Sequence, residues 1–166
     1  MDCADEPETL SAGKANQLRV PQKGEQMMKH YANASLAYAA AAMVSGVFYR
    51  EFTKLNGFTG HTNLSVMHTH YFILGMFFFL LLMLLEKNFS FSGEKGVGKI
   101  IAVYHAGLNI TGLGFLLRGL TQVWNSTLSR GMDASISGIA GIGHILLSVG
   151  VILLLLRLRK QVVKDN

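Results

Sequence analysis

Four stretches of about 20 residues, each with almost no charged side chain, constrain this chain more than any other feature, because each is long enough to cross the roughly 30 Å hydrocarbon core of a bilayer. They run from about Tyr31 to Tyr49, Leu64 to Leu85, Lys99 to Leu120 and Ala134 to Leu156. Runs this long without turn signals are typical of helices, and open strand edges would leave backbone groups unpaired in lipid. The sequence therefore predicts an all-α integral membrane protein folded as a four-helix bundle.

The composition excludes several other classes of protein. Of the 166 residues, 50% are hydrophobic and 15% are charged, whereas soluble domains carry about 25% charged residues. About 80 residues remain outside the four stretches, too few for a separate soluble domain with its own core. The single cysteine, Cys3, excludes a disulfide framework, a cysteine zinc site and covalent c-type haem. We expect membrane lipid, and not nucleic acid, around this chain.

The lysines and arginines predict the orientation. We expect residues 1–29 to be a polar, mobile N-terminal tail, 30–158 the transmembrane domain and 159–166 a C-terminal tail. Eleven lysines and arginines lie in the two tails and around the second loop, against four in the other two loops and their flanks. The positive-inside rule then places both termini in the cytoplasm, with the protein in the cell membrane.

Histidines are the most prominent candidates for chemistry. Four of the six lie within the predicted spans: His68, His70, His105 and His144. Ionisable groups at membrane depth are costly and mark functional sites, although a single hydrogen bond between helices is the simpler explanation for each. We expect His105, only about 9 Å from the inner surface, to make such a bond or a contact on the cytoplasmic side.

The spacing of His68 and His70 is the most informative part of this pattern. Two residues along a helix rotate by about 200°, so the two side chains leave opposite faces and cannot chelate one ion together. Either one of them is a bystander, or the helix lies between two sites and serves both. A planar macrocycle on each side would fit this arrangement.

The segment Met67–Met76, MHTHYFILGM, resembles the His-x-His-Tyr helix of the catalytic subunit of haem-copper oxidases. This resemblance implies that His68 and His70 each ligate the iron of a noncovalently bound haem b. It also implies a haem-copper-oxidase-like four-helix unit, because the oxidase subunit is built of three four-helix arcs around a pseudo-threefold axis. The chain lacks the His-His pair and the His-x-x-x-Tyr sequence of the copper centre.

The same resemblance suggests a homotrimer with a haem between protomers, ligated by His68 of one chain and His70 of its neighbour. The rival geometry lies within one chain and sets His68 or His70 opposite His144. Depths counted from the helix ends differ by about 6–9 Å, which disfavours this geometry and leaves His144 a hydrogen-bonding or cavity-lining role near the cofactor. Arg50 and Arg118 are the candidate partners of the haem propionates, because a guanidinium pairs bidentately with a carboxylate.

A second resemblance covers most of the chain. The region from about Met28, including residues 46–54 (GVFYREFTK) and 137–144 (SGIAGIGH), resembles a family of small bacterial four-helix membrane proteins of unknown function. It implies the fold and supplies no activity.

These observations favour a membrane b-type haem protein, bis-histidine ligated, that transfers electrons or senses redox state, with a quinol or another redox partner. The alternative is a metal-free accessory membrane subunit, or a small-solute conduit, whose histidines are structural. Copper handling is a third possibility, since imidazole and thioether ligands suit copper(I). Met67, Met76 and Met83 are nevertheless more typical of packing.

Overall fold

The computed structural model describes residues 23–164. Within this range every regular element is helical, which confirms the all-α part of the predicted fold class. The elements are α1 (Lys23–Leu55), α2 (Leu64–His70), the π-helical turn η1 (Tyr71–Phe77), α3 (Phe78–Phe89), the 3₁₀ turn η2 (Phe91–Gly93), α4 (Val97–Val123) and α5 (Arg130–Lys164). The segments α2, η1 and α3 form one continuous rod.

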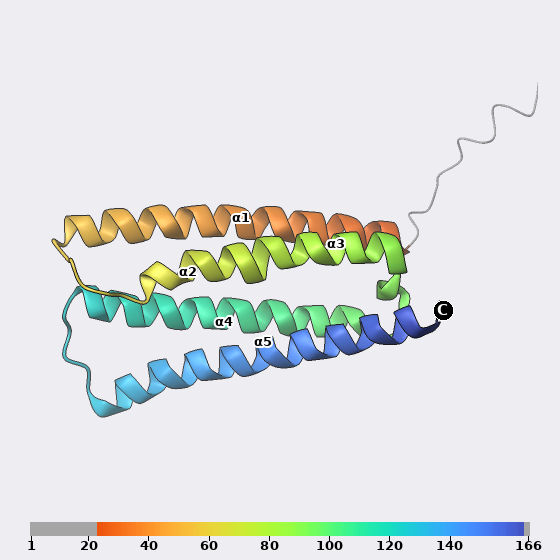
Figure 1. Cartoon of the computed structure of the whole chain (residues 1–166). Coiled ribbons are helices and arrows are strands. Elements are labelled where there is room, and N and C mark those ends of the chain that lie inside the picture. The colour runs from red at the N-terminus through yellow and green to blue at the C-terminus, as the bar shows by residue number, and fades with distance from the viewer. Residues whose placement is uncertain (1–22, 165–166) are drawn as a thin grey trace, which may run out of the picture.

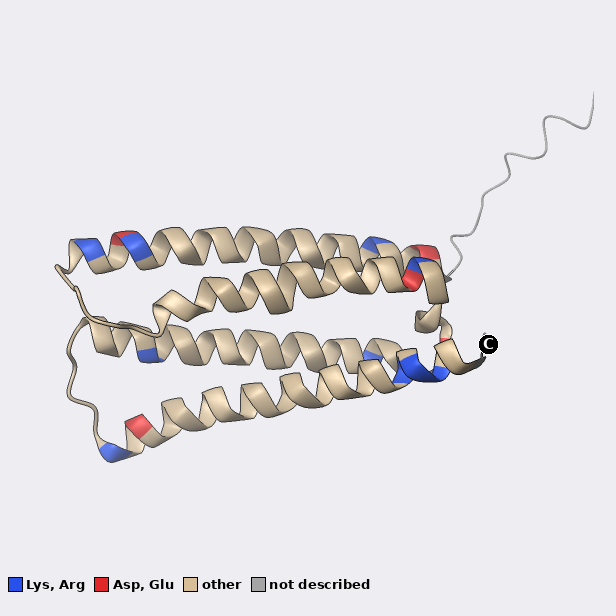
Figure 2. Cartoon of the chain, in the orientation of Figure 1, with Lys and Arg blue, Asp and Glu red and all other residues tan. Residues whose placement is uncertain are grey.

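The four rods lie side by side in chain order, and α5 diverges from α4 toward its own N-terminus (Figure 1). The start of α1 and the end of α5 lie at the same end of the molecule, which we call the terminal end; the loops 56–63 and 124–129 lie at the opposite end. Charged residues gather near these two ends and leave a long uncharged middle (Figure 2). This distribution is the one expected of a protein that crosses a bilayer.

Three helical segments of the described chain are long and apolar enough to cross a membrane: Leu64–Phe89, Val97–Val123 and Arg130–Val163. These coincide with the second, third and fourth predicted spans. The first predicted span lies within α1, which contains many alanine and polar residues and is not apolar enough by the same measure. The four-span prediction is therefore confirmed for three spans.

Two helices extend beyond the predicted domain limits of 30 and 158. Helix α1 already includes Lys23–Lys29, where Glu25 and Lys29 form an ion pair of 3.0 Å one helical turn apart. Helix α5 continues to Lys164, and Arg157 reaches Glu94 at 3.4 Å. The remainder of the predicted tails, 1–22 and 165–166, lies outside the described residues.

Aromatic side chains fill the core at the terminal end. Tyr31, Phe79, Phe91 and Tyr104 are fully or almost fully buried. The hydroxyl of Tyr31 shares a 2.6 Å hydrogen bond with that of Ser92. This packing holds α1, α3 and α4 together, closer to the terminal end than the paired histidines described next.

Candidate metal centre

His70 and His144 lie side by side on the same side of α4. The ring of His70, at the end of α2, is 6.3 Å from the ring of His144 on α5, centre to centre, and the two rings are nearly perpendicular at 87°. Phe115 of α4 contacts both, at 4.6 Å from His70 and 5.8 Å from His144. The structure therefore brings together three rings from three helices.

This proximity corrects the predicted difference in depth between His70 and His144. Helix α2 does not begin at the end of the bundle, because the loop before it folds back along α4. The hydroxyl of Thr62 donates to the Gly119 carbonyl at 3.0 Å, and the Asn63 amide donates to Gln122 Oε1 at 2.8 Å. Counting residues from the helix ends was therefore the wrong measure of depth.

Contacts with α4 place His70 and His144 at a similar depth along the bundle. The Tyr71 hydroxyl lies where a Cβ on Gly112 would be, and Thr111 lies where a Cβ on Gly143 would be. His70 and His144 are the chain neighbours of Tyr71 and Gly143, so both lie near residues 111–112 along α4.

The hydrogen bonds of the two imidazoles define their tautomers. Nδ1 of His70 is 2.9 Å from the Val66 carbonyl oxygen, and Nδ1 of His144 is 2.7 Å from the Ala140 carbonyl oxygen. A carbonyl oxygen only accepts, so each Nδ1 carries a hydrogen, and in the neutral imidazole Nε2 then has the free lone pair. Metal-ligating histidines commonly have this arrangement, in which the nitrogen that does not bind the metal donates to a carbonyl or carboxylate.

The spacing of the rings also suits a shared metal. An ion held about 2 Å from one nitrogen of each imidazole, with the two bonds opposite, keeps the ring centres about 6 Å apart. The observed 6.3 Å agrees with that value. Within the described residues no group of three or more histidine, cysteine, aspartate or glutamate side chains is placed to hold a metal ion. A metal between these rings would thus have two ligands from the described chain.

His68 leaves the other side of the rod, as its spacing from His70 predicted. A Cβ on Gly46 of α1 would lie 3.7 Å from the Cβ of His68, so this ring packs toward α1. Its Nδ1 is buried and has no hydrogen-bond partner among the described residues. The structure does not bring His68 to the His70–His144 pair.

His105 belongs to a separate cluster, as expected. Asn109 donates to the Tyr38 hydroxyl oxygen at 2.9 Å, and that hydroxyl is 2.7 Å from Nδ1 of His105. The His105 ring also stacks on Phe79 at 4.5 Å. The predicted hydrogen-bonding role of His105 is confirmed.

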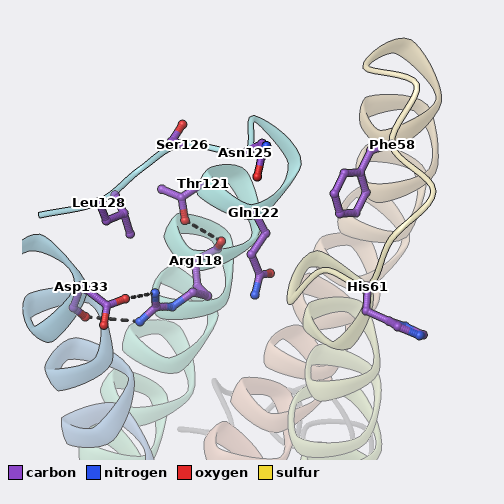
Figure 3. Close-up of a pocket in the computed structure, with 9 residues that line it drawn as sticks. All are labelled: Phe58, His61, Arg118, Thr121, Gln122, Asn125, Ser126, Leu128 and Asp133. Atoms are coloured by element: carbon purple, nitrogen blue, oxygen red, sulfur yellow. Dashed lines mark hydrogen bonds and ion pairs between the residues drawn. The ribbon is translucent and has the colours of Figure 1, made fainter. Parts of the chain in front are cut away.

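Arg118 already has an anionic partner within the chain. Its guanidinium forms an ion pair with Asp133 of α5 and also donates to the Asp133 main-chain oxygen at 3.3 Å (Figure 3). It donates as well to the Ser137 hydroxyl at 2.6 Å. Sequence reasoning did not find Asp133, although an acidic residue in the first turn of a helix is a signal for such pairing. Arg50 is highly exposed and lies 3.8 Å from the neighbouring Glu51. The proposed propionate contacts of both arginines stay predictions.

The Arg118–Asp133 pair lies at one side of an open polar pocket of about 480 Å³ at the opposite end. The pocket is lined by Phe58, His61, Arg118, Thr121, Gln122, Asn125, Ser126, Leu128 and Asp133. The His61 ring points away from the ion pair (Figure 3). The arrangement indicates that Arg118 ties the diverging start of α5 to α4.

Substitution of Arg118 by glutamine is expected to loosen this end of α5 with a small effect on overall stability. Asp133 is largely exposed, and exposed ion pairs contribute about 0–1 kcal/mol. Limited proteolysis should therefore cut the loop 124–129 faster in Arg118→Gln than in the parent protein. Arg130→Gln, at the exposed first residue of α5, is the control and should leave the cleavage rate unchanged. Equal rates in all three proteins would contradict the tethering role.

The fold and the charge distribution define a helical protein with three segments suited to crossing a membrane. The chain belongs to the family described as "Protein of unknown function (DUF2871)", whose model matches residues 28–161. This agrees with the predicted membership of a family without an assigned activity, and it provides no link to haem-copper oxidases. No curated protein and no solved structure matches the chain.

Proposed function

We propose that this protein binds haem b between His70 and His144 of one chain and acts in electron transfer or redox sensing within the membrane. The observation that supports this proposal is the pair of imidazoles 6.3 Å apart, each with its Nδ1 hydrogen held by a main-chain carbonyl. Both rings thus offer an Nε2 lone pair. A haem held by two imidazoles is six-coordinate and low-spin and carries one electron at a time.

The position of the Phe115 ring determines whether a haem fits between the two imidazoles. This ring lies against both imidazoles, within the radius that a porphyrin centred between them would occupy. The donor set therefore suits haem, whereas the Phe115 ring occupies part of the space, so haem binding requires this side chain to move.

The position of Phe115 also favours a second candidate, a single copper ion between the same two imidazoles. Such an ion needs no rearrangement of Phe115, and imidazole is a good copper ligand. A protein of this kind would store or pass on copper. The metal-free alternative, with purely structural histidines, predicts neither cofactor.

A visible spectrum with metal analysis separates these proposals. The full chain is purified in detergent from cells supplied with iron and a haem precursor, and haem, iron and copper are quantified per chain. The proposal expects a Soret band with the resolved α and β bands of six-coordinate haem. A colourless protein that contains copper would support the second candidate, and one with neither would leave the histidines structural.

Enlargement of residue 115 distinguishes haem from a bare ion. In Phe115→Trp the larger ring fills more of the space needed by the porphyrin, so we expect the haem content to fall more than about tenfold, in the range seen when groups around a metal site are altered. Copper bound at the same imidazoles should be retained. Phe52→Trp, on α1, serves as the control. Unchanged haem content in Phe115→Trp would place the haem elsewhere.

The proposed electron transfer needs an electron donor and an electron acceptor. A lipid-soluble quinol is the class of donor that reaches a site at membrane depth. In the trimeric arrangement, His68 and His70 of neighbouring chains ligate one haem. The histidine variants in the Discussion distinguish it from ligation by His70 and His144 of one chain.

A further inference from the structure

The rod that carries His68 and His70 contains an unusual turn directly after them. Residues Tyr71–Phe77 are π-helical, and the amide of Phe78 donates to the carbonyl of Ile73, five residues earlier. Turns of this kind are rare and are frequently found at functional sites.

Two hydroxyl groups from neighbouring helices donate to carbonyl oxygens of this turn. Tyr104 of α4 donates to the Leu74 oxygen at 2.6 Å, and Ser35 of α1 donates to the Met76 oxygen at 2.9 Å. A carbonyl oxygen has two lone pairs and can accept these bonds beside its helical ones. In a membrane, where water is scarce, such side-chain donors help to stabilise a departure from α-helical bonding.

A third contact comes from Tyr38 of α1. Its ring packs onto Gly75 so closely that a Cβ there would lie 2.6 Å from the Tyr38 Cβ and Cγ. Tyr38 is itself held by His105 and Asn109. Residues of both α1 and α4 therefore contact the π-helical turn and hold it in place.

We propose that Ser35 and Tyr104 are positioning residues that hold this turn and thereby set the rotation of α2 about its axis. One residue of an α-helix corresponds to about 100° of rotation. If the turn relaxes to α-helical bonding, the residues before it rotate relative to α3. With the turn held, His70 faces His144 and His68 faces α1. The expected effect on haem binding rests on the proposed function, whereas the rotation of α2 does not.

Distances between spin labels test the rotation without any cofactor. In a Cys3→Ser background, one label pair joins α2 to α5 through Thr69→Cys and Ser148→Cys, and a second joins α3 to α5 through Lys87→Cys and Val163→Cys; all four positions are exposed. In the double variant Ser35→Ala/Tyr104→Phe we expect the first distance to shift by several Å and the second to stay unchanged. An unchanged first distance, or equal changes in both, would overturn the proposal.

Two further variants separate positioning from general stability. Tyr31→Phe removes another buried tyrosine hydroxyl, bonded to Ser92 away from the turn, and should change neither distance. Ser35→Thr keeps a hydroxyl and, in the Tyr104→Phe background, should move the first distance back toward the parent value. A failure of Ser35→Thr to do so would argue against the hydroxyl as the cause.

The haem spectrum provides the second readout. If the parent protein binds haem, we expect Ser35→Ala/Tyr104→Phe to lose the six-coordinate signature while Tyr31→Phe keeps it. If the parent protein binds none, the proposed function fails and the spin-label distances still decide the positioning role. The two failures are thus distinguishable.

Discussion

Replacement of either His70 or His144 by alanine is expected to remove the haem signature. Loss of a group that merely supports a metal ligand already lowers metal affinity about 10–100-fold, so the loss of a ligand should cost at least as much. Haem per chain, measured from the Soret band after purification, should therefore fall more than about tenfold in both variants. Circular dichroism checks that the helices remain.

His68→Ala and His61→Ala are the matched comparisons. His68 packs toward α1 and His61 is exposed at the opposite end, so both variants should keep their haem. If His68→Ala and His70→Ala lose the haem while His144→Ala keeps it, the ligands come from neighbouring chains and the single-chain proposal is wrong. Size measurement of the detergent complex would then test the trimer.

Substitution of Gly107 by alanine should strongly destabilise the pair of helices α4 and α5. A Cβ at this position would collide with the main-chain nitrogen of Leu147 and would lie 2.9 Å from the main-chain carbon of Leu146. Main-chain atoms cannot turn aside as a side chain can, so the two helices must separate. Overpacking of this kind costs about 1–3 kcal/mol, and more where the backbone has to move.

Gly98→Ala, on the same helix, is the matched control. Nothing lies within 4 Å of the Cβ that it would add, and alanine favours helix over glycine by up to about 1 kcal/mol. Thermal unfolding in detergent, followed by circular dichroism, should show a clear loss of stability for Gly107→Ala and none for Gly98→Ala. Equal behaviour of the two variants would contradict the close contact of α4 with α5.

The apolar runs predicted most of the fold because length and hydrophobicity are local properties. They located the second and third rods to within a few residues, whereas the fourth, predicted to end near Leu156, continues to Lys164. The extra turns at both ends were missed because they depend on charges. Glu25 pairs with Lys29 outside any apolar run, and Arg157 pairs with Glu94, which is distant in sequence.

The candidate site was only partly predictable. The opposite directions of His68 and His70 follow from helix geometry alone. The pairing of His70 with His144 depends on a loop that folds back along α4, and no local pattern encodes that. The ion pair of Arg118 with Asp133 was not predicted, because it depends on how the short loop before α5 is folded. The π-helical turn had no clear sequence signal beyond Gly75.

The hydrogen bonds from His70 to Val66 and from His144 to Ala140 affect how the two imidazoles respond when surrounding residues are substituted. Each imidazole is hydrogen-bonded to the main chain of its own helix and not to a neighbouring side chain. Exchange of surrounding residues therefore alters the polarity and shape around the two rings while the free nitrogen stays the same. To change the partner of Nδ1, the imidazole must rotate or the helical turn beneath it must unwind.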